Sequence, residues 1–273
     1  MNTIIRFSAF FVLLISAFFV NGQNLDTRQA PLPCVDKTFS VIAHIVLDSL
    51  GEPNITEAAI QESIDSANSA FSPICIRFEI CEFRIIPNFQ FDTLNFGNTE
   101  FDELQVQHHV ANRINMFFIT DFETQMPPYV CGSTNLGGIT ELEEGGLVIR
   151  KGDCMESGSK TVPHELGHFF GLLHTFEGNR EEFVNGSNCA TTADMICDTP
   201  SDPFLIGDPI SIYIDEAEEC RFILPEMDAN GEWYAPDVGN YMNYYPSECA
   251  CGFTHEQYLR MAETFLSSSP KAW

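Results

Sequence analysis

Two histidines and a glutamate form the most chemically informative cluster in the sequence. His164 and His168 are four residues apart, so a helix would place both imidazoles on one face, one turn apart, where they can share a single ion. Glu165 lies beside them. Gly171 follows three residues after His168, where a residue free to adopt positive φ can end the helix and turn the chain back. His174, three residues further on, could then return to the same ion.

This spacing predicts a zinc site with hydrolytic chemistry. Three neutral imidazoles occupy three corners of a tetrahedron around zinc and leave the fourth to water. A carboxylate adjacent to that water, Glu165, can take its proton and later deliver it to a leaving amine. The alternative is an amphipathic core helix that carries histidines by chance. We disfavour it because the chain has only 7 His in 273 residues.

The surrounding pattern predicts the elements that position the cluster. Residues 38–48 are typical of a strand, and Asn54-Ile55-Thr56-Glu57 predicts a capped helix start. Apolar residues then recur at helical spacing at Ile60, Ile64, Ala67 and Phe71. Residues 74–80 alternate as a half-buried strand does, residues 114–120 predict another strand, and residues 254–265 predict a closing helix. Together they indicate a helix-backed sheet.

The segment HELGHFFGLLH resembles the signature of the metzincin zinc endopeptidases, and its surroundings resemble the pappalysin (cytophagalysin) family within them. The resemblance covers roughly residues 37–265. Its further motifs are His174-Thr175-Phe176, Cys197-Asp198-Thr199-Pro200, Gly239-Asn240-Tyr241-Met242-Asn243-Tyr244, and Phe253-Thr254-His255-Glu256-Gln257 before Arg260-Met261.

The resemblance implies an α+β metzincin fold with two lobes. The upper lobe, about 37–171, would hold a twisted mixed sheet, a backing helix and the active-site helix. The lower lobe, about 172–273, would be irregular and rich in disulfides, with the Met-turn and the C-terminal helix. Met242 would support the zinc ligands from below without binding metal. Tyr244 would approach the metal or the oxyanion, or else belong to an aromatic cluster filling the lower core.

In metzincins a strand at the cleft rim runs antiparallel to bound substrate. We assign this rim strand to residues 131–135, with a shifted register at 136–140 as the alternative, and place a second strand at 147–150. An exposed edge there would hold a peptide by its backbone.

The N-terminus predicts export. Residues 1–22 combine Arg6, an apolar run and a small residue, Gly22, at the expected cleavage point of a signal peptide. The apolar run is short for a membrane span. Residues 23–36 are a candidate propeptide, in which a Cys34 thiolate could occupy the fourth zinc position. A disulfide from Cys34 to Cys251 or another cysteine is the favoured alternative.

Ten cysteines in an exported chain favour disulfides over a cysteine zinc cluster. Cys75 and Cys81 lie too far apart along one strand to bond each other. By resemblance to the family, Cys189 pairs with Cys220 and Cys197 with Cys249. Cys131 with Cys154 is a further candidate.

The net charge of −26 argues against nucleic acid and anionic membranes as partners. As in the family, carboxylates could bind calcium, and the candidates are Asp194, Asp198 and Thr199, with Asp208 beyond them. Asp228-x-Asn230-Gly231 is more typical of a turn. His44, His108 and His109 lack ligand spacing and are interpreted as structural or solvated. The oligomeric state does not follow from the sequence.

The predicted function is a secreted zinc-dependent endopeptidase acting on protein or peptide. The main alternative is an exported zinc-binding module of the same fold without turnover, such as an adhesin or inhibitor. The intact Glu165 argues against that alternative, and a zinc hydrolase acting on another substrate is a weaker one.

Overall fold

The structure is a computed structural model that describes residues 30–95, 99–123, 130–140, 146–215 and 220–268. The chain divides into two compact units, Met1–Ala30 and Pro31–Trp273, and the described helices and strands all lie in the second. The expected signal peptide, residues 1–22, lies outside the described residues. In the described part, no helix is both long enough and apolar enough to cross a bilayer.

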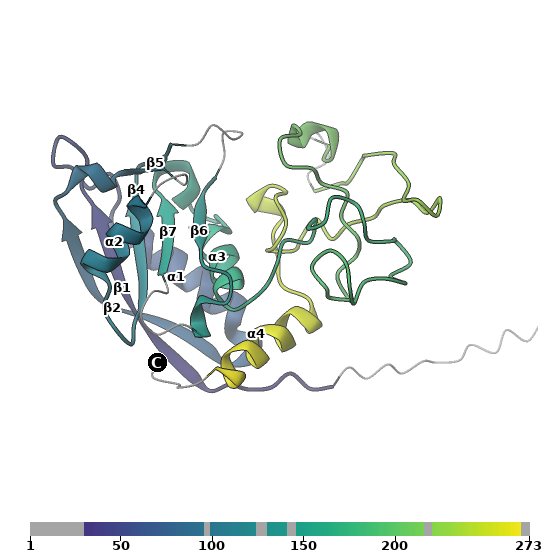
Figure 1. The fold of residues 1–273 in the computed structure, drawn as a ribbon, viewed down its shortest axis with the longest axis horizontal. Helices are drawn as coiled ribbons and strands as arrows, with labels where there is room; N and C mark the ends of the chain where they lie inside the picture. The colour runs from purple at the N-terminus through teal and green to yellow at the C-terminus, as the bar shows by residue number, and fades with distance from the viewer. Residues whose placement is uncertain (1–29, 96–98, 124–129, 141–145, 216–219, 269–273) are drawn as a thin grey trace, which may run out of the picture. The chain divides into compact units, whose positions relative to one another are not determined.

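A five-stranded mixed sheet forms the framework of the upper lobe (Figure 1). Its strands run in the order β2-β1-β4-β7-β6, and all neighbours are parallel except β6, which is antiparallel to β7. The bounds are β1 Lys37–Val46, β2 Ile76–Ile86, β4 Ile114–Ile119, β6 Gly132–Thr134 and β7 Gly146–Arg150. Two short strands, β3 Thr93–Leu94 and β5 Asp121–Phe122, pair separately. The predicted mixed sheet is confirmed, and β6 occupies one of its edges.

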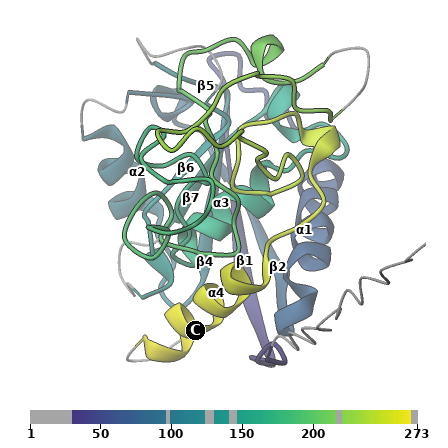
Figure 2. The ribbon, with the colours of Figure 1, turned by 90° about the vertical axis from the view of Figure 1, so that its right-hand side faces the viewer.

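Among the described residues, four α-helices accompany the sheet (Figures 1 and 2). The helix α1 (Glu57–Phe71) begins at the expected cap, where Thr56 Oγ1 accepts the amide of Ala59 at 3.1 Å. The helix α4 (His255–Ser267) begins with a capping box between Thr254 and Gln257. Both helices bury the apolar face that their spacing predicts. The remaining two are α2 (Glu100–His108) and α3 (Thr161–Phe169).

The two faces of the sheet bury separate apolar clusters. One face packs with α1, α3 and α4 around a large core that includes Phe39, Phe71 and Phe170. The opposite face packs with α2 around a smaller cluster that includes Leu104 and Phe117. The helix α3, which carries the HELGHF segment, therefore lies inside the larger core, where packing fixes its position.

The described part of the lower lobe before α4 is irregular, with only short 3-10 turns at Ile210–Ile212 and Ser247–Cys249. A third cluster, which includes Phe204, Tyr213 and Tyr245, forms its core. Asp228 accepts the amides of Asn230 and Glu232, so that segment is the turn that we predicted.

Four disulfides cross-link the structure: Cys34–Cys75, Cys131–Cys154, Cys189–Cys197 and Cys220–Cys249. Cys131–Cys154 is confirmed, and Cys75 does not bond Cys81. The pairings of Cys189 with Cys220 and Cys197 with Cys249 are wrong. The residues between Cys189 and Cys197 turn tightly, with positive φ at Ala193 and Met195, and bring the two Cα atoms to 5.1 Å.

Cys34 is bonded to Cys75, just before β2, which confirms the favoured disulfide with a partner other than Cys251. It is therefore not the free thiolate that a cysteine latency switch requires. Cys81 and Cys251 are exposed thiols.

Candidate active site

The helix α3 carries His164, Glu165 and His168 and ends where the sequence predicts. Pro163 lies in its first turn, where a backbone amide has no intrahelical partner to lose. Gly171 has φ +90° and donates its amide to the His168 carbonyl at 2.8 Å. The chain then leaves the helix axis and brings His174 back toward the first two histidines.

The three histidines converge through their Nε2 atoms. His168 Nε2 lies 3.1 Å from His164 Nε2 and 3.0 Å from His174 Nε2. In the described part of the chain, this is the single group of three or more histidine, cysteine or acidic side chains arranged to hold one metal ion.

The tautomers of His164 and His168 leave nitrogen lone pairs that can bind a metal ion. The Nδ1 atoms of His164 and His168 lie 2.7 Å from the carbonyl oxygens of Tyr241 and Leu172. A carbonyl only accepts, so each Nδ1 carries the proton and each Nε2 presents a lone pair. Lone pairs 3.1 Å apart repel one another unless a cation lies between them. The donor set therefore suits a divalent metal with nitrogen preference.

Burial sets the charge state of these groups. It lowers the pKa of His164 well below its usual value, with further contributions from the neighbouring histidines, and lowers the pKa of His168 to about 3. Both imidazoles are thus neutral, as metal ligands must be. Burial also raises the pKa of Glu165 to about 8. A cation at the histidine centre would oppose that rise by favouring the carboxylate.

Glu165 lies against the edge strand β6. A Cβ built on Gly132 would lie 2.6 Å from Glu165 Cγ and 2.7 Å from Oε1, closer than real Cβ contacts come. Only glycine at position 132 leaves room for this carboxylate. The predicted rim strand lies here, but the sequence does not single out Gly132, because its partner Glu165 is 33 positions away in the chain.

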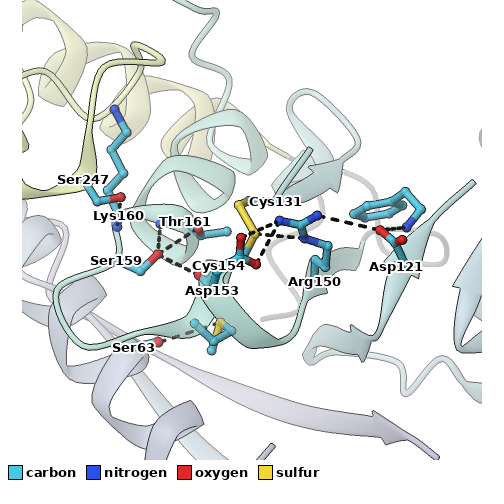
Figure 3. Close-up of a disulfide and its surroundings, with 12 residues drawn as sticks. Ser63, Asp121, Cys131, Arg150, Asp153, Cys154, Ser159, Lys160, Thr161 and Ser247 are labelled. Carbon is cyan, nitrogen blue, oxygen red and sulfur yellow. Dashed lines mark hydrogen bonds and ion pairs between the residues drawn. A yellow bond between two sulfur atoms is a disulfide. The ribbon is translucent and has the colours of Figure 1, made fainter. Parts of the chain in front are cut away.

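A disulfide connects this strand to the turn that precedes α3. Cys131, just before β6, bonds Cys154 in the turn that leads toward Lys160 (Figure 3). Arg150, at the end of β7, donates to both carboxylate oxygens of Asp153 at 2.9 and 3.1 Å. These two links tie the β6 edge and the end of β7 to the turn at Gly152–Met155, which precedes α3.

Met242 lies beneath the histidines, fully buried. Its sulfur packs against the backbone of Gly167, one residue before His168, so closely that a Cβ there would overlap it. Two backbone carbonyls of this segment also accept hydrogen bonds. The Tyr241 carbonyl accepts from His164 Nδ1, and the Met242 carbonyl accepts from the Thr175 amide at 3.2 Å.

Tyr244 lies beside the histidine centre. Its ring centroid is 4.7 Å from that of His174 and 5.7 Å from that of His164, and it is 43% exposed. Burial of its hydroxyl region, together with the charges of Glu165 and Glu177, raises the pKa of Tyr244 to about 12. Its phenol therefore keeps its proton as a donor.

The candidate calcium residues form a separate group away from the histidines. Asp194 Oδ1 accepts from the Ile196 amide and from Thr199 Oγ1 at 3.0 and 3.1 Å. Asp194 Oδ2 and Asp198 Oδ1 are buried oxygens without a hydrogen-bond partner among the described residues. Burial raises the pKa of Asp194 to about 7, with Asp198 adding to the rise.

The other histidines lie outside the site. His44 is buried in β1, stacks on Phe117 and bonds Asn115 Oδ1 at 2.9 Å, which fits a structural role. Asp208 accepts the Tyr213 hydroxyl at 2.7 Å in the lower-lobe core.

Comparisons with known proteins agree with this geometry. The family model of M43 peptidases, described as pregnancy-associated plasma protein-A, matches residues 138–266, and that of reprolysin-like metallopeptidases of family M12B matches residues 57–175. A solved structure of a Tannerella forsythia promirolysin mutant matches with a TM-score of 0.56 at 17% identity, covering 88% of this chain and 84% of that one.

Curated relatives include fungal proteins named extracellular metalloproteases. One from Verticillium alfalfae is 24% identical over 94% of this chain and 88% of its own length. One from Pyricularia oryzae is 26% identical over 90% of this chain and 78% of its own. One from Aspergillus fumigatus is 34% identical over 39% of this chain and 27% of its own.

Fold, histidine centre and family matches together define a metalloprotease of the metzincin type. Within that class, the match over residues 138–266 confirms the resemblance to the pappalysins.

Proposed function

We propose that the protein is an exported, zinc-dependent endopeptidase that hydrolyses peptide bonds with a water activated by Glu165. The observation that carries the proposal is the convergence of three imidazole Nε2 atoms next to a buried glutamate that contacts β6, an edge strand of the sheet in the described part of the chain. Export is supported by the names of the fungal relatives and by the predicted signal peptide.

His164, His168 and His174 would hold the zinc, with their Nδ1 sides directed to protein acceptors. When bound, zinc acidifies a water molecule and polarises the scissile carbonyl. Calcium or magnesium fits less well, because these hard cations prefer oxygen ligands and the centre offers three imidazoles.

The chain's own groups then have separate tasks. A carboxylate oxygen of Glu165 takes the proton from the attacking water and delivers it to the leaving amine. The Tyr244 hydroxyl donates a hydrogen bond to the developing oxyanion. The outer side of β6, which no described strand pairs with, binds the peptide backbone and orients the scissile bond over the site. Met242 holds the ligand-bearing segments in place from below.

We also propose that Asp194 and Asp198 bind a calcium ion with a structural role. Two buried carboxylate oxygens without partners are costly, and a hard, oxygen-preferring cation would satisfy both. Protein or peptide is the proposed partner, and the net charge of −26 argues against nucleic acid.

Cleavage-site profiling of the recombinant protein with a mixed peptide library tests the function. We expect internal cleavage that a zinc chelator abolishes and added zinc restores. Zinc binding at one equivalent without any cleavage would instead establish a binding module. Cleavage that resists the chelator would remove the zinc mechanism.

A further inference from the structure

The three metal-binding histidines are not held equally. His164 and His168 lie on α3 and their Nδ1 atoms bond backbone carbonyls at 2.7 Å. His174 lies on the irregular segment beyond Gly171, and its Nδ1 is 3.6 Å from Glu177, whose side chain is 48% exposed. An exposed carboxylate at that distance restrains a side chain weakly. Something else must fix the backbone that carries His174.

Thr175, the next residue, supplies the restraint. It is 4% exposed, and its amide donates to the Met242 carbonyl at 3.2 Å. Its hydroxyl donates to Asp202 Oδ2 at 2.7 Å. Thr175 is thus held between the Met-turn and a carboxylate on a different segment of the lower lobe.

The second oxygen of the same carboxylate accepts a hydrogen bond from the residue that follows Tyr244. Asp202 Oδ1 accepts the Tyr245 hydroxyl at 2.7 Å and the Phe204 amide at 3.1 Å. Tyr245 is 1% exposed and directly follows Tyr244. One carboxylate therefore bonds the immediate neighbours of His174 and of Tyr244.

A buried lysine joins this network to α3. Lys160, just before the helix, donates from Nζ to Asn243 Oδ1 at 2.6 Å, and the Tyr245 amide donates to the same oxygen at 2.9 Å. Figure 3 shows the Lys160 side chain extending away from the Cys131–Cys154 disulfide. When protonated, Lys160 offsets part of the rise that burial causes in the pKa of Asp202, while burial lowers the pKa of Lys160 itself to about 7.

We infer that Asp202 is a positioning residue of the metal centre, which fixes His174 through Thr175 and Tyr244 through Tyr245. The inference rests on the proposed zinc site. A buried carboxylate costs free energy, and an apolar side chain would fill the same space at less cost. Its two oxygens instead receive directional bonds from residues adjacent to the site, which is the arrangement that orients metal ligands.

The test measures zinc affinity by chelator competition, beside a thermal melt of each variant. Thr175→Val keeps the side-chain shape and removes the bond, and Thr175→Ser keeps the hydroxyl. We expect Thr175→Val and Asp202→Asn to lower zinc affinity about 10- to 100-fold, with Thr175→Ser close to wild type.

The control is Tyr213→Phe, which removes a buried hydroxyl that donates to Asp208 at 2.7 Å and accepts from Leu205 and Arg180 in the same lobe. The phenylalanine keeps the ring contacts with Phe204 and Tyr245, and none of these hydrogen bonds involves Thr175 or Asp202. This variant should leave zinc affinity unchanged.

Wild-type zinc affinity in folded Thr175→Val would overturn the inference. So would an equal loss in Tyr213→Phe, since it would indicate general loosening of the lobe. Because the readout is zinc binding, a protein that binds zinc but cleaves nothing contradicts only the proposed function. A wild-type protein that binds no zinc overturns both.

Discussion

Gly132 on the edge strand and Glu165 on the active-site helix are in such close contact that position 132 has no room for a side chain. The strand proposed to align substrate thus touches the proposed general base directly. In the proposed mechanism, this one contact couples the register of the substrate to proton transfer by Glu165.

Gly132→Ala should therefore impair catalysis more than folding. The added methyl group displaces the Glu165 carboxylate or the strand by about an ångström, which we expect to lower kcat/KM about 100-fold while zinc stays bound. Gly252→Ala is the matched control, because a Cβ there meets nothing within 4 Å. Peptide hydrolysis at the wild-type rate by Gly132→Ala would show that the contact does not constrain the base.

Tyr244→Phe should separate oxyanion stabilisation from metal binding. It removes only the hydroxyl from a ring that packs 4.7 Å from His174. If the phenol donates to the oxyanion, kcat falls by up to about 100-fold with zinc content and KM little changed. Full kcat in the variant would leave Tyr244 as part of the aromatic cluster alone.

His44 should make the fold sensitive to acid. Burial lowers its pKa from 6.5 to about 4, with Arg84, His108 and His109 adding to the fall and the Asn115 bond opposing it. The unfolded chain therefore binds the proton more readily, so stability is lost as the pH falls from 6.5 toward 4, by about 3 kcal/mol in all.

His44→Gln keeps a donor for Asn115 and removes the titration. Chemical denaturation at a series of pH values should give the variant a flatter profile between pH 6.5 and 4. Parallel profiles for the two proteins would assign the acid sensitivity to other groups.

If Asp194 binds calcium, the melting temperature of the protein should depend on calcium. Its pKa is raised to about 7 in the fold, so without a cation the buried carboxylate costs stability as the pH rises from 3.8 through 7. Calcium at pH 8 should raise the Tm of the wild type. Asp194→Asn should lose that response and melt higher than the wild type in chelator. A wild-type Tm indifferent to calcium would end the calcium proposal.

The sequence predicted what depends on local spacing. His164 and His168 share a helix face because of their four-residue separation, and Gly171 ends the helix because its φ is positive. The helix α2 was missed because its apolar pattern is weak: Val106 in it is 84% exposed.

Contacts between distant segments were not predictable. Asp202 lies 27 positions from Thr175 and 43 from Tyr245, and no periodicity relates them. The disulfide partners of Cys189 and Cys197 were likewise not predictable, because they depend on the path of an irregular segment. The family resemblance supplied a connectivity that the tight turn between these two cysteines contradicts.

The most direct test of the central claim compares Glu165→Gln with the wild type in peptide hydrolysis and zinc content. Glutamine keeps the size and buried position of Glu165 but cannot accept the proton. We predict a folded protein with one equivalent of zinc and hydrolysis reduced by at least about 100-fold. Undiminished cleavage by that zinc-loaded variant would contradict the account.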